Sequence, residues 1–197
     1  MSEMNILSDV NAESINWNVQ DQFKGLSLEE IRNIQPKLPF SVCMLNTTGS
    51  LNIGVALRSA VLFGASKFYI AGRRRFDKRS TVGAQNYIDV ERIDAIDENG
   101  KYDTDLIVNT IQEDGYSPIM IETGEKELSL DMLMYHEKWK NLVPCFFFGE
   151  EKAGIPKDLL DDFPIYTIPT IGVLRSLNVS IAASIVLYEA AKFYRKI

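Results

Sequence analysis

The chain has 197 residues, of which 46% are hydrophobic and 24% are charged, and its net charge is −6 at pH 7. A chain of this size and composition can bury the core of one globular domain, and no apolar run reaches the roughly 18 residues that a membrane span requires. The acidic charge excludes a general nucleic-acid coat protein, which would be strongly basic, so any RNA contact has to be local.

The first 38 residues are predicted to form an N-terminal extension, followed by one main domain over residues 39–197. Within the extension, Ser27-Leu28-Glu29-Glu30 has the pattern of a capping box. This box opens a short helix that ends before Pro36, because the residue before a proline disfavours helical geometry.

From residue 40 onward, apolar strand-like runs alternate with helical patterns. Strands are predicted at residues 40–46, 67–71, 117–122, 143–148 and 165–168, and helices at 52–63, 104–114, 128–135, 156–162 and in a long C-terminal segment. Residues 80–100 are interpreted as a polar stretch without a strand. Strands separated by helices predict an α/β fold, with a parallel sheet and helices on both faces. Such sheets bind ligands at the carboxyl ends of their strands.

The C-terminal helix is apolar or small on nearly every face between Leu177 and Leu187, which predicts burial on most sides. Ser176 or Asn178 is its expected N-cap. Capping explains neither Arg175 nor the Pro-Thr-Ile-Gly loop before it.

Cys43 and Cys145 lie far apart, each in an apolar strand-like run, and there is no CxxC pair. The acidic, polar start of the chain lacks the pattern of a secretory signal. Both cysteines are therefore interpreted as reduced core thiols of a cytoplasmic protein. The single histidine, His136, has no companions for a zinc site, and no metal is expected.

Three polar segments follow predicted strands, at residues 52–58, 149–156 and 169–178. Taken separately, each has a structural interpretation: an Asn cap with a packing glycine, a strand–turn–helix connection, and the N-cap of the last helix. The second segment is not a phosphate loop, because no Lys-Ser/Thr pair follows its second glycine.

Taken together and in this order, the segments resemble the motifs of the SpoU (TrmH-type) branch of the SPOUT superfamily of RNA methyltransferases. The matching patterns are NxGxxxR at 52–58, FGEEKAGIP at 148–156 and IPxxGxxxSLNVSxAA at 168–183. The resemblance covers about residues 40–195. It implies a C-terminal trefoil knot, an exception to the rule against knots, a homodimer, and S-adenosylmethionine bound in the knot.

The resemblance also implies roles for individual residues. The implied cofactor-binding residues are Glu122, Thr123, Gly149, Gly154, Ile168, Ser176 and Leu177. The implied catalytic residues are Arg58, Asn52, Glu150, Ser176 and Asn178. The implied reaction is methyl transfer to a ribose 2′-hydroxyl of tRNA or rRNA. Base methylation, found in other SPOUT branches, is a nearby alternative, although the SLNVS form of the third motif favours the ribose.

An arginine stays protonated in proteins, so Arg58 is interpreted as a clamp on the target phosphate rather than as a base. Glu150 is the expected ion-pair partner of its guanidinium. The target phosphate or a water is expected to help take the proton of the attacking hydroxyl.

A basic run, Arg73-Arg74-Arg75-Phe76-Asp77-Lys78-Arg79, follows the second predicted strand. Four arginines and a lysine in seven residues of an acidic chain favour contacts with an RNA backbone through Arg73, Arg74, Arg75 and Arg79, although a solvated charge run needs no function.

Because the chain is acidic overall, the use of a partner protein for RNA delivery is left as an open alternative. The main rival function is a non-catalytic RNA-binding or adaptor protein that retains the fold. An ordinary α/β nucleotide-binding enzyme is disfavoured, because its glycine fingerprints are missing.

Overall fold

The protein is described here from a computed structural model. The structure describes residues 19–45, 51–72, 78–123, 128–133, 142–150 and 153–195. Contacts within the chain divide it into two compact units, residues 1–35 and residues 36–197.

The described part of the first unit holds one α-helix, α2 (Leu28–Ile34), preceded by a 3-10 helix at Asp21–Phe23. The capping box predicted for α2 is confirmed. The side chain of Ser27 accepts a hydrogen bond from the backbone N–H of Glu30, and the Glu30 carboxylate accepts one from the backbone N–H of Ser27 at 2.7 Å. The helix gives way to extended backbone at Gln35, just before Pro36, as the proline predicts.

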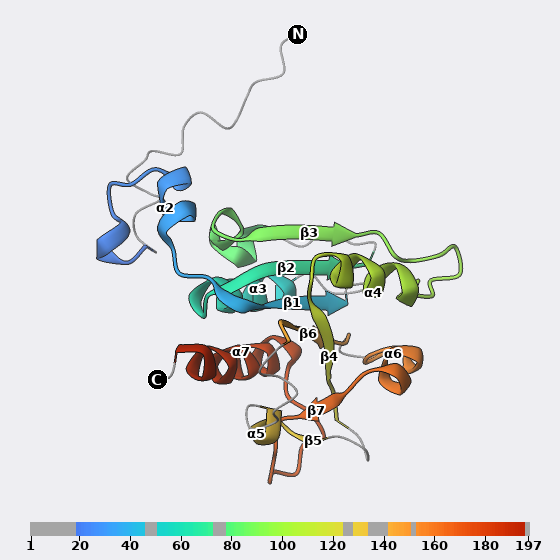
Figure 1. The fold of residues 1–197 in the computed structure, drawn as a ribbon. Coiled ribbons are helices and arrows are strands. Elements are labelled where there is room, and N and C mark those ends of the chain that lie inside the picture. The colour runs from blue at the N-terminus through green and yellow to red at the C-terminus, as the bar shows by residue number, and fades with distance from the viewer. Residues whose placement is uncertain are drawn as a thin grey trace. The chain divides into compact units, whose positions relative to one another are not determined.

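The second unit is built on a seven-stranded sheet in the order β3-β2-β1-β6-β4-β7-β5, and all neighbouring strands pair in parallel (Figure 1). The strands are β1 (Leu38–Leu45), β2 (Ala65–Ala71), β3 (Asp89–Ile93), β4 (Ser117–Ile121), β5 (Leu128–Ser129), β6 (Pro144–Phe148) and β7 (Ile165–Thr167). The predicted parallel sheet is confirmed.

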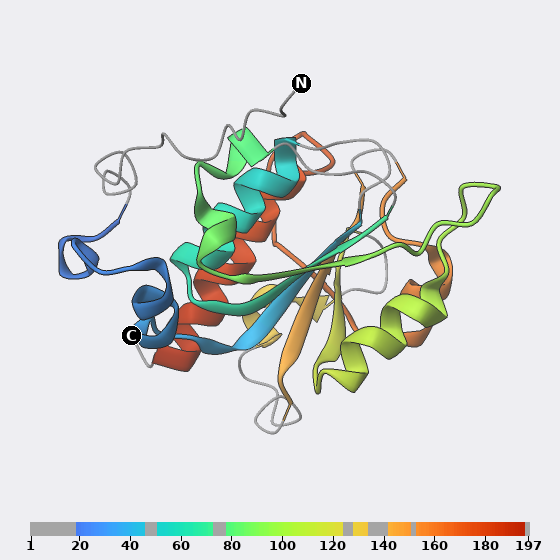
Figure 2. The ribbon, with the colours of Figure 1, turned by 90° about the horizontal axis from the view of Figure 1, so that it is seen from above.

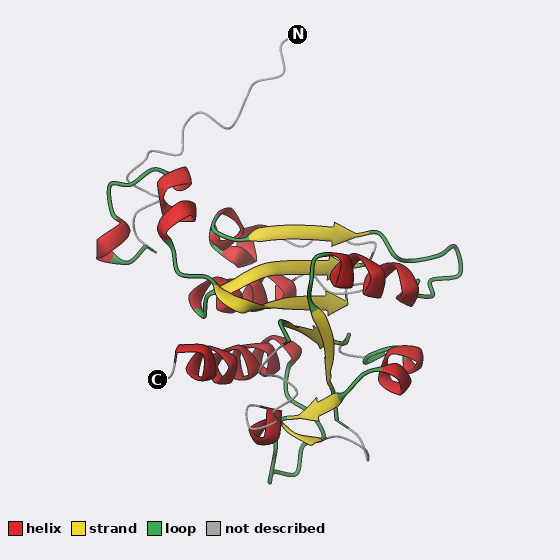
Figure 3. Cartoon of the chain, in the orientation of Figure 1, coloured by secondary structure: helices red, strands yellow, loops and turns green. Residues whose placement is uncertain are grey.

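Helices cover both faces of this sheet (Figures 2 and 3). The helices are α3 (Leu51–Leu62), α4 (Thr104–Glu113), α5 (Leu130–Leu133), α6 (Lys157–Asp162) and α7 (Val179–Arg195). Helices α3 and α7 lie side by side on one face, where the hydroxyls of Ser59 and Ser184 are 2.7 Å apart. Helices α4 and α6 lie on the other face. No helix in the described ranges is long and apolar enough to cross a bilayer.

The two faces hold separate cores because successive side chains of a strand point to opposite sides. From β1, Val42 and Met44 pack in the core beneath α3 and α7, whereas Cys43 and Leu45 pack in the core beneath α4 and α6. With both sides covered, β1 and β6 can be apolar at nearly every position. Cys43 and Cys145 are free and buried, as predicted, and burial raises the pKa of the Cys145 thiol to about 12.

The sequence interpretation missed two strands, and both lie at edges of the sheet. β3 is the polar run Asp-Val-Glu-Arg-Ile, which is mostly half-buried or exposed because only one neighbour covers its edge. β5 has only two residues and begins the segment predicted as a helix at 128–135. Short polar edge strands carry little of the apolar signal on which strand prediction depends.

The prediction that α7 is buried on most sides is confirmed at most positions, which are buried or half-buried, but one narrow stripe of the helix is exposed. One face is buried through residues such as Ala183, Val186 and Leu187. The opposite side exposes Ile181 and Tyr188, which keep 48% and 50% of their accessible surface. Apolar side chains therefore face outward on a helix whose sequence resembles a core helix.

Candidate active site

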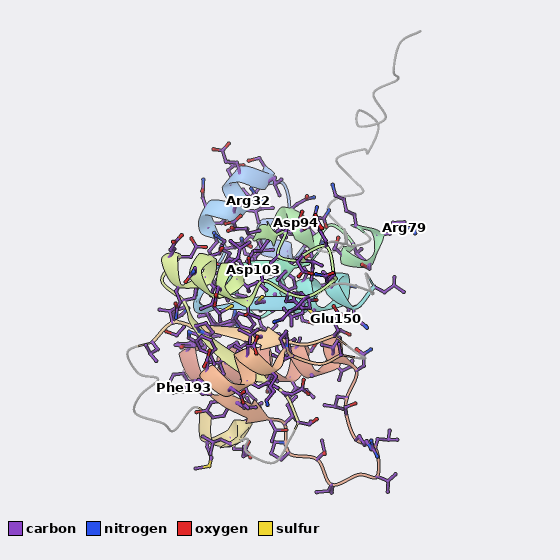
Figure 4. The ribbon with its side chains drawn as sticks, turned by 90° about the vertical axis from the view of Figure 1, so that its right-hand side faces the viewer. Arg32, Arg79, Asp94, Asp103, Glu150 and Phe193 are labelled. Atoms are coloured by element: carbon purple, nitrogen blue, oxygen red, sulfur yellow. The ribbon has the colours of Figure 1, made fainter. Side chains whose placement is uncertain are left out.

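A cavity of about 680 Å³ lies at the carboxyl edge of the sheet, where β4, β6 and β7 end. Its volume falls within the range of small-molecule sites in proteins, about 300–1,000 Å³. Figure 4 looks onto the side where β1, β2 and β3 end, and Glu150 lies near the middle of that view. The segment between β7 and α7 extends away from the sheet (Figure 1).

The cavity collects residues from two of the three motif segments and from the end of β4. All seven predicted cofactor residues line it: Glu122, Thr123, Gly149, Gly154, Ile168, Ser176 and Leu177. Three predicted catalytic residues, Glu150, Ser176 and Asn178, line it as well. The cavity therefore brings together nine different predicted residues, because Ser176 belongs to both groups. Asn52 and Arg58 lie outside its lining.

Gly149 is required by a close approach of two backbone segments. A Cβ at this position would lie 2.3 Å from the carbonyl carbon of Gly154 and 2.7 Å from the nitrogen of Ile155, and neither backbone atom can easily move away. Glu150 and Gly154 pair through reciprocal backbone hydrogen bonds of 3.1 and 2.9 Å. Gly154 has a φ of +65°, which a side chain would strain. The two glycines therefore allow the two backbone segments of this turn to lie directly against each other in the wall of the cavity.

Glu122 ties the end of β4 to the same turn. Its carboxylate accepts hydrogen bonds from the backbone N–H groups of Thr123, at 3.0 Å, and Ile155, at 3.2 Å. Acceptance by a carboxylate strengthens both bonds relative to a neutral acceptor. Glu122 is thus a structural tie between two walls of the cavity as well as one of its lining residues.

Asn178 connects the N-termini of α7 and α3. Its side-chain oxygen accepts from the backbone N–H of Ser180 at 2.9 Å and from the Ser180 hydroxyl at 2.7 Å, so Asn178 is the N-cap of α7. Its amide nitrogen donates to the side-chain oxygen of Asn52 at 3.1 Å. Asn52 is therefore linked to the cavity through Asn178, although it does not line the cavity itself.

The expected ion pair between Glu150 and Arg58 is not formed. Instead, the Glu150 carboxylate accepts a hydrogen bond from the hydroxyl of Tyr102, a residue that precedes α4. Arg58 is exposed on α3 and forms no hydrogen bond or ion pair with the described residues. Arg58 lies six residues beyond Asn52, and 100° of rotation per residue turns it to another side of the helix.

Arg58 belongs to a row of exposed side chains on α3. Leu51, Val55 and Leu62 keep 65%, 41% and 67% of their accessible surface and recur at intervals of three or four residues with Arg58. Such spacing places all four on one side of the helix. The guanidinium thus sits within an apolar stripe, a surface of the kind that marks interaction sites.

Two residues of the site were missed or left without a role by the sequence interpretation. Arg175 lines the cavity and makes no hydrogen bond or ion pair with any described residue. In the sequence, Arg175 could have been found from its position directly before Ser176 in the third motif. Tyr102 could not be found from sequence, because it lies 48 residues from Glu150 and outside every motif.

The described residues include only the C-terminal end of the basic run. Arg73, Arg74 and Arg75 lie outside the described residues, whereas Arg79 is exposed in a 3-10 helix at Lys78–Thr81. This segment packs tightly on α3, since a Cβ on Gly54 would lie 1.7 Å from the hydroxyl oxygen of Ser80. Gly54 thereby fixes the end of the basic run beside the first motif. Within the described ranges, no group of three His, Cys, Asp or Glu side chains could hold a metal ion.

The model of the SpoU rRNA Methylase family matches residues 39–188, more than half of the chain. The chain belongs to this family.

Individual relatives and solved structures are similar to this chain at 18–25% identity. A tRNA (guanosine(18)-2′-O)-methyltransferase of Borreliella burgdorferi is 25% identical over 151 residues, which cover 75% of this chain and 63% of that protein. The chain thus spans less than two thirds of that relative. Among solved structures, the A. aeolicus TrmH/SpoU tRNA modifying enzyme has a TM-score of 0.70 at 18% identity, covering 86% of this chain and 83% of the other. An AdoMet-bound rRNA methyltransferase from Sinorhizobium meliloti has a TM-score of 0.64 at 24% identity, covering 82% and 59%. These structures share the fold of this chain.

Proposed function

We propose that this protein is an S-adenosylmethionine-dependent RNA methyltransferase that modifies a ribose 2′-hydroxyl of tRNA or rRNA. The observation that carries the proposal is the convergence of Glu122, Gly149, Ser176 and Asn178 on one cavity at the carboxyl edge of the sheet. The activities named for the Borreliella and Sinorhizobium proteins support the same reaction class. A non-catalytic adaptor is not favoured, because it would have no need of this cavity.

The lining fits S-adenosylmethionine chemically. Ile121, Ile155 and Leu177 offer apolar surface to a nucleoside, Arg175 offers a cation to a carboxylate, and Glu150 offers a carboxylate to a sulfonium. Gly149 lets such a molecule lie against the backbone, because a side chain there would collide with the opposite strand of the turn. The cofactor would be held by the seven lining residues predicted for it.

The proposed reaction needs the 2′-oxygen held in line with a methyl group. When bound, S-adenosylmethionine would supply that methyl: the new C–O bond would form as the S–C bond breaks, giving a thioether, and the hydroxyl proton would be released. Glu150, Ser176 and Asn178 lie where they can orient the ribose. The proton passes to the target phosphate or to a water, because Arg58 stays protonated and serves as the phosphate clamp.

The chain is further proposed to act as a homodimer. The exposed stripe of Leu51, Val55 and Leu62 on α3 and the outward face of α7 at Ile181 and Tyr188 supply apolar surface for a second copy. Arg58 lies on that stripe, so a dimer formed there would bring it to the interface. The site is then completed by the second copy, which accounts for an Arg58 that lies outside the cavity of its own chain.

A trefoil knot is proposed for residues 168–178. β7 lies beyond β4 in the sheet, whereas α7 packs beside α3 on the face near β1. The chain between them has to cross back past β4 and β6 at the carboxyl edge. A crystal structure in which this crossing passes outside the connection between β4 and β6 would contradict the knot.

The cytoplasm is the compartment that we propose for this protein. The buried, free thiols of Cys43 and Cys145 suit its reducing conditions.

The reaction is tested with purified protein, S-adenosylmethionine labelled in its methyl group, and total RNA from cells that lack the gene. Methylation of a 2′-oxygen removes the nucleophile that cleaves the adjacent phosphodiester in alkali. The label should therefore appear in alkali-resistant dinucleotides. Label in mononucleotides would indicate base methylation, and RNA without label would contradict the proposed function.

A further inference from the structure

The hydroxyl of Tyr102 donates a hydrogen bond to Oε1 of Glu150. Tyr102 precedes α4, whereas Glu150 follows β6 and lines the cavity. No motif contains Tyr102, and the proposed reaction assigns it no role. It is a hydrogen-bond donor that reaches a proposed catalytic carboxylate from another part of the fold.

The backbone around Tyr102 is held on both sides. Before it, the Asp97 carboxylate accepts hydrogen bonds of 2.9 and 2.8 Å from two backbone amides of the turn, and Ile96 pairs with Tyr102 in a short antiparallel bridge. After it, the side chain of Asp103 caps α4 by accepting from the backbone N–H of Leu106 at 3.0 Å. The phenol is thus carried by a short turn that its own hydrogen bonds keep rigid.

The ring of Tyr102 and the backbone of Glu150 are also held in place. The ring of Tyr102 packs against the core beneath α4 and α6, which includes Ile155 and Leu159. The backbone of Glu150 is tied to Gly154 by the two hydrogen bonds of their bridge. The Tyr102 hydroxyl contacts the end of the Glu150 side chain, at the carboxylate itself.

We propose that Tyr102 is a positioning residue for Glu150, holding its carboxylate in one orientation toward the cavity. A catalytic side chain works best when hydrogen bonds from a surrounding layer restrict its rotamers. The aromatic ring suits this task, because it loses little conformational entropy when it is ordered. The inference rests on the proposed function for its kinetic consequence, although the orientation of Glu150 can be observed without it.

The kinetic test is a double-mutant cycle. Tyr102→Phe keeps the ring and removes the hydroxyl, and it should lower kcat roughly tenfold while the KM for S-adenosylmethionine stays unchanged. In a Glu150→Ala background, the same substitution should cause little further loss, because the side chain through which it acts is gone. Equal losses in both backgrounds, or a Tyr102→Phe variant with wild-type kcat, would overturn the proposal.

Tyr116→Phe is the matched control. Tyr116 packs against the same core, but its hydroxyl lies 2.9 Å from the hydroxyl of Ser66, away from the cavity. This control should retain wild-type kcat. A general response of the core to losing a tyrosine hydroxyl would lower kcat in both variants and overturn the positioning role.

A crystal structure of Tyr102→Phe provides the readout that does not depend on activity. The Glu150 carboxylate should move or occupy more than one rotamer. A carboxylate that keeps its wild-type position would overturn the inference even if the wild-type protein proved to transfer no methyl group. Absence of transfer by the wild-type protein is a failure of the proposed function alone.

Discussion

Two groups of polar side chains among the described residues, one at each end of the sheet, are built differently. Nearer the amino ends of β2, β3 and β4, the ammonium of Lys67 lies 2.5 Å from Asp114 and 2.6 Å from Glu91. The Tyr69 hydroxyl donates to the same Asp114 oxygen at 2.5 Å. Its partners hold the pKa of Lys67 above its usual range, and this cluster is closed on itself.

At the carboxyl edge, polar side chains instead line an open space. The side chains of Glu122 and Asn178 accept hydrogen bonds from backbone N–H groups and so hold the walls of the cavity in place. Arg175, which lines the cavity, and Arg58 on α3 have no hydrogen-bonding partner among the described residues. A polar network that satisfies itself stabilises a fold, whereas one that presents charges to a cavity is suited to a ligand. Substitutions at the two places should therefore affect different properties.

The largest effect is expected from Arg58→Ala. Loss of the phosphate clamp should lower methyl transfer by about 10²–10³-fold, a magnitude seen when one charge-stabilising donor is removed. Binding of S-adenosylmethionine, measured by calorimetry, should be nearly unchanged, because Arg58 does not line the cavity.

Arg195→Ala, which removes an exposed cation at the end of α7, is the control and should retain activity. Size-exclusion chromatography of both variants would show whether the oligomeric state has changed. Loss of cofactor binding in Arg58→Ala would contradict the clamp role.

The next effect concerns RNA binding. Replacing Arg73, Arg74, Arg75 and Arg79 with Ser should weaken RNA affinity. It should also reduce the slope of log K against log salt concentration by up to about 3, the contribution expected from four phosphate contacts with a single strand. The comparison is a variant that loses four exposed cations elsewhere, Arg92, Lys101, Lys157 and Arg195. Filter binding at several salt concentrations measures both. Equal slopes in the two variants would remove the basic run from the RNA-binding surface.

A smaller effect is expected from Gly149→Ala. The added Cβ collides with the backbone of Gly154 and Ile155, so this wall of the cavity has to shift. S-adenosylmethionine affinity should fall roughly tenfold, about 1.4 kcal/mol. Gly172→Ala in the third motif is the matched control, since its Cβ meets nothing within 4 Å. Similar calorimetric affinities for the two variants would show that Gly149 is not part of the cofactor site.

The smallest effect belongs to the closed cluster. Asp114→Asn removes a carboxylate that accepts from Lys67 and Tyr69, and should lower stability by about 1 kcal/mol, a figure that allows for the solvent exposure of Asp114. The corresponding change in Tm is about 3 °C. Methyl transfer should be unaffected. Glu113→Gln, an exposed neighbour on α4, should leave Tm unchanged.

The pH dependence of this difference has a defined sign. Hydrogen bonds from Lys67 and then Tyr69 lower the pKa of Asp114 in the folded state. Its contribution is therefore complete above the unfolded pKa of about 3.9 and is lost as the pH falls through the folded value. The gap in Tm between the wild type and Asp114→Asn should be constant near neutral pH and should narrow below about pH 4. A gap that widens in acid would contradict the role of the cluster.

Sequence predicted much of the fold because its central strands carry continuous apolar runs, such as Pro144–Phe148. The strand Asp89–Ile93 escaped prediction because an edge strand needs few apolar residues. The cavity lining followed from the family motifs, whose residues stand at strand ends. The contact of Tyr102 with Glu150 could not be predicted, because a single hydrogen bond between residues distant in the chain leaves no local sequence pattern. The expected ion pair of Arg58 with Glu150 was wrong, because helix rotation turns Arg58 away from Asn52, which belongs to the same motif.

The central claim is that the cavity between β4, β6 and β7 holds the methyl donor. A crystal structure of the protein soaked with S-adenosylmethionine tests this most directly. The account predicts electron density for the cofactor against Gly149, Ile168 and Leu177, with its sulfonium on the side of Glu150. Density at another place on the sheet, with this cavity holding only water, would contradict it.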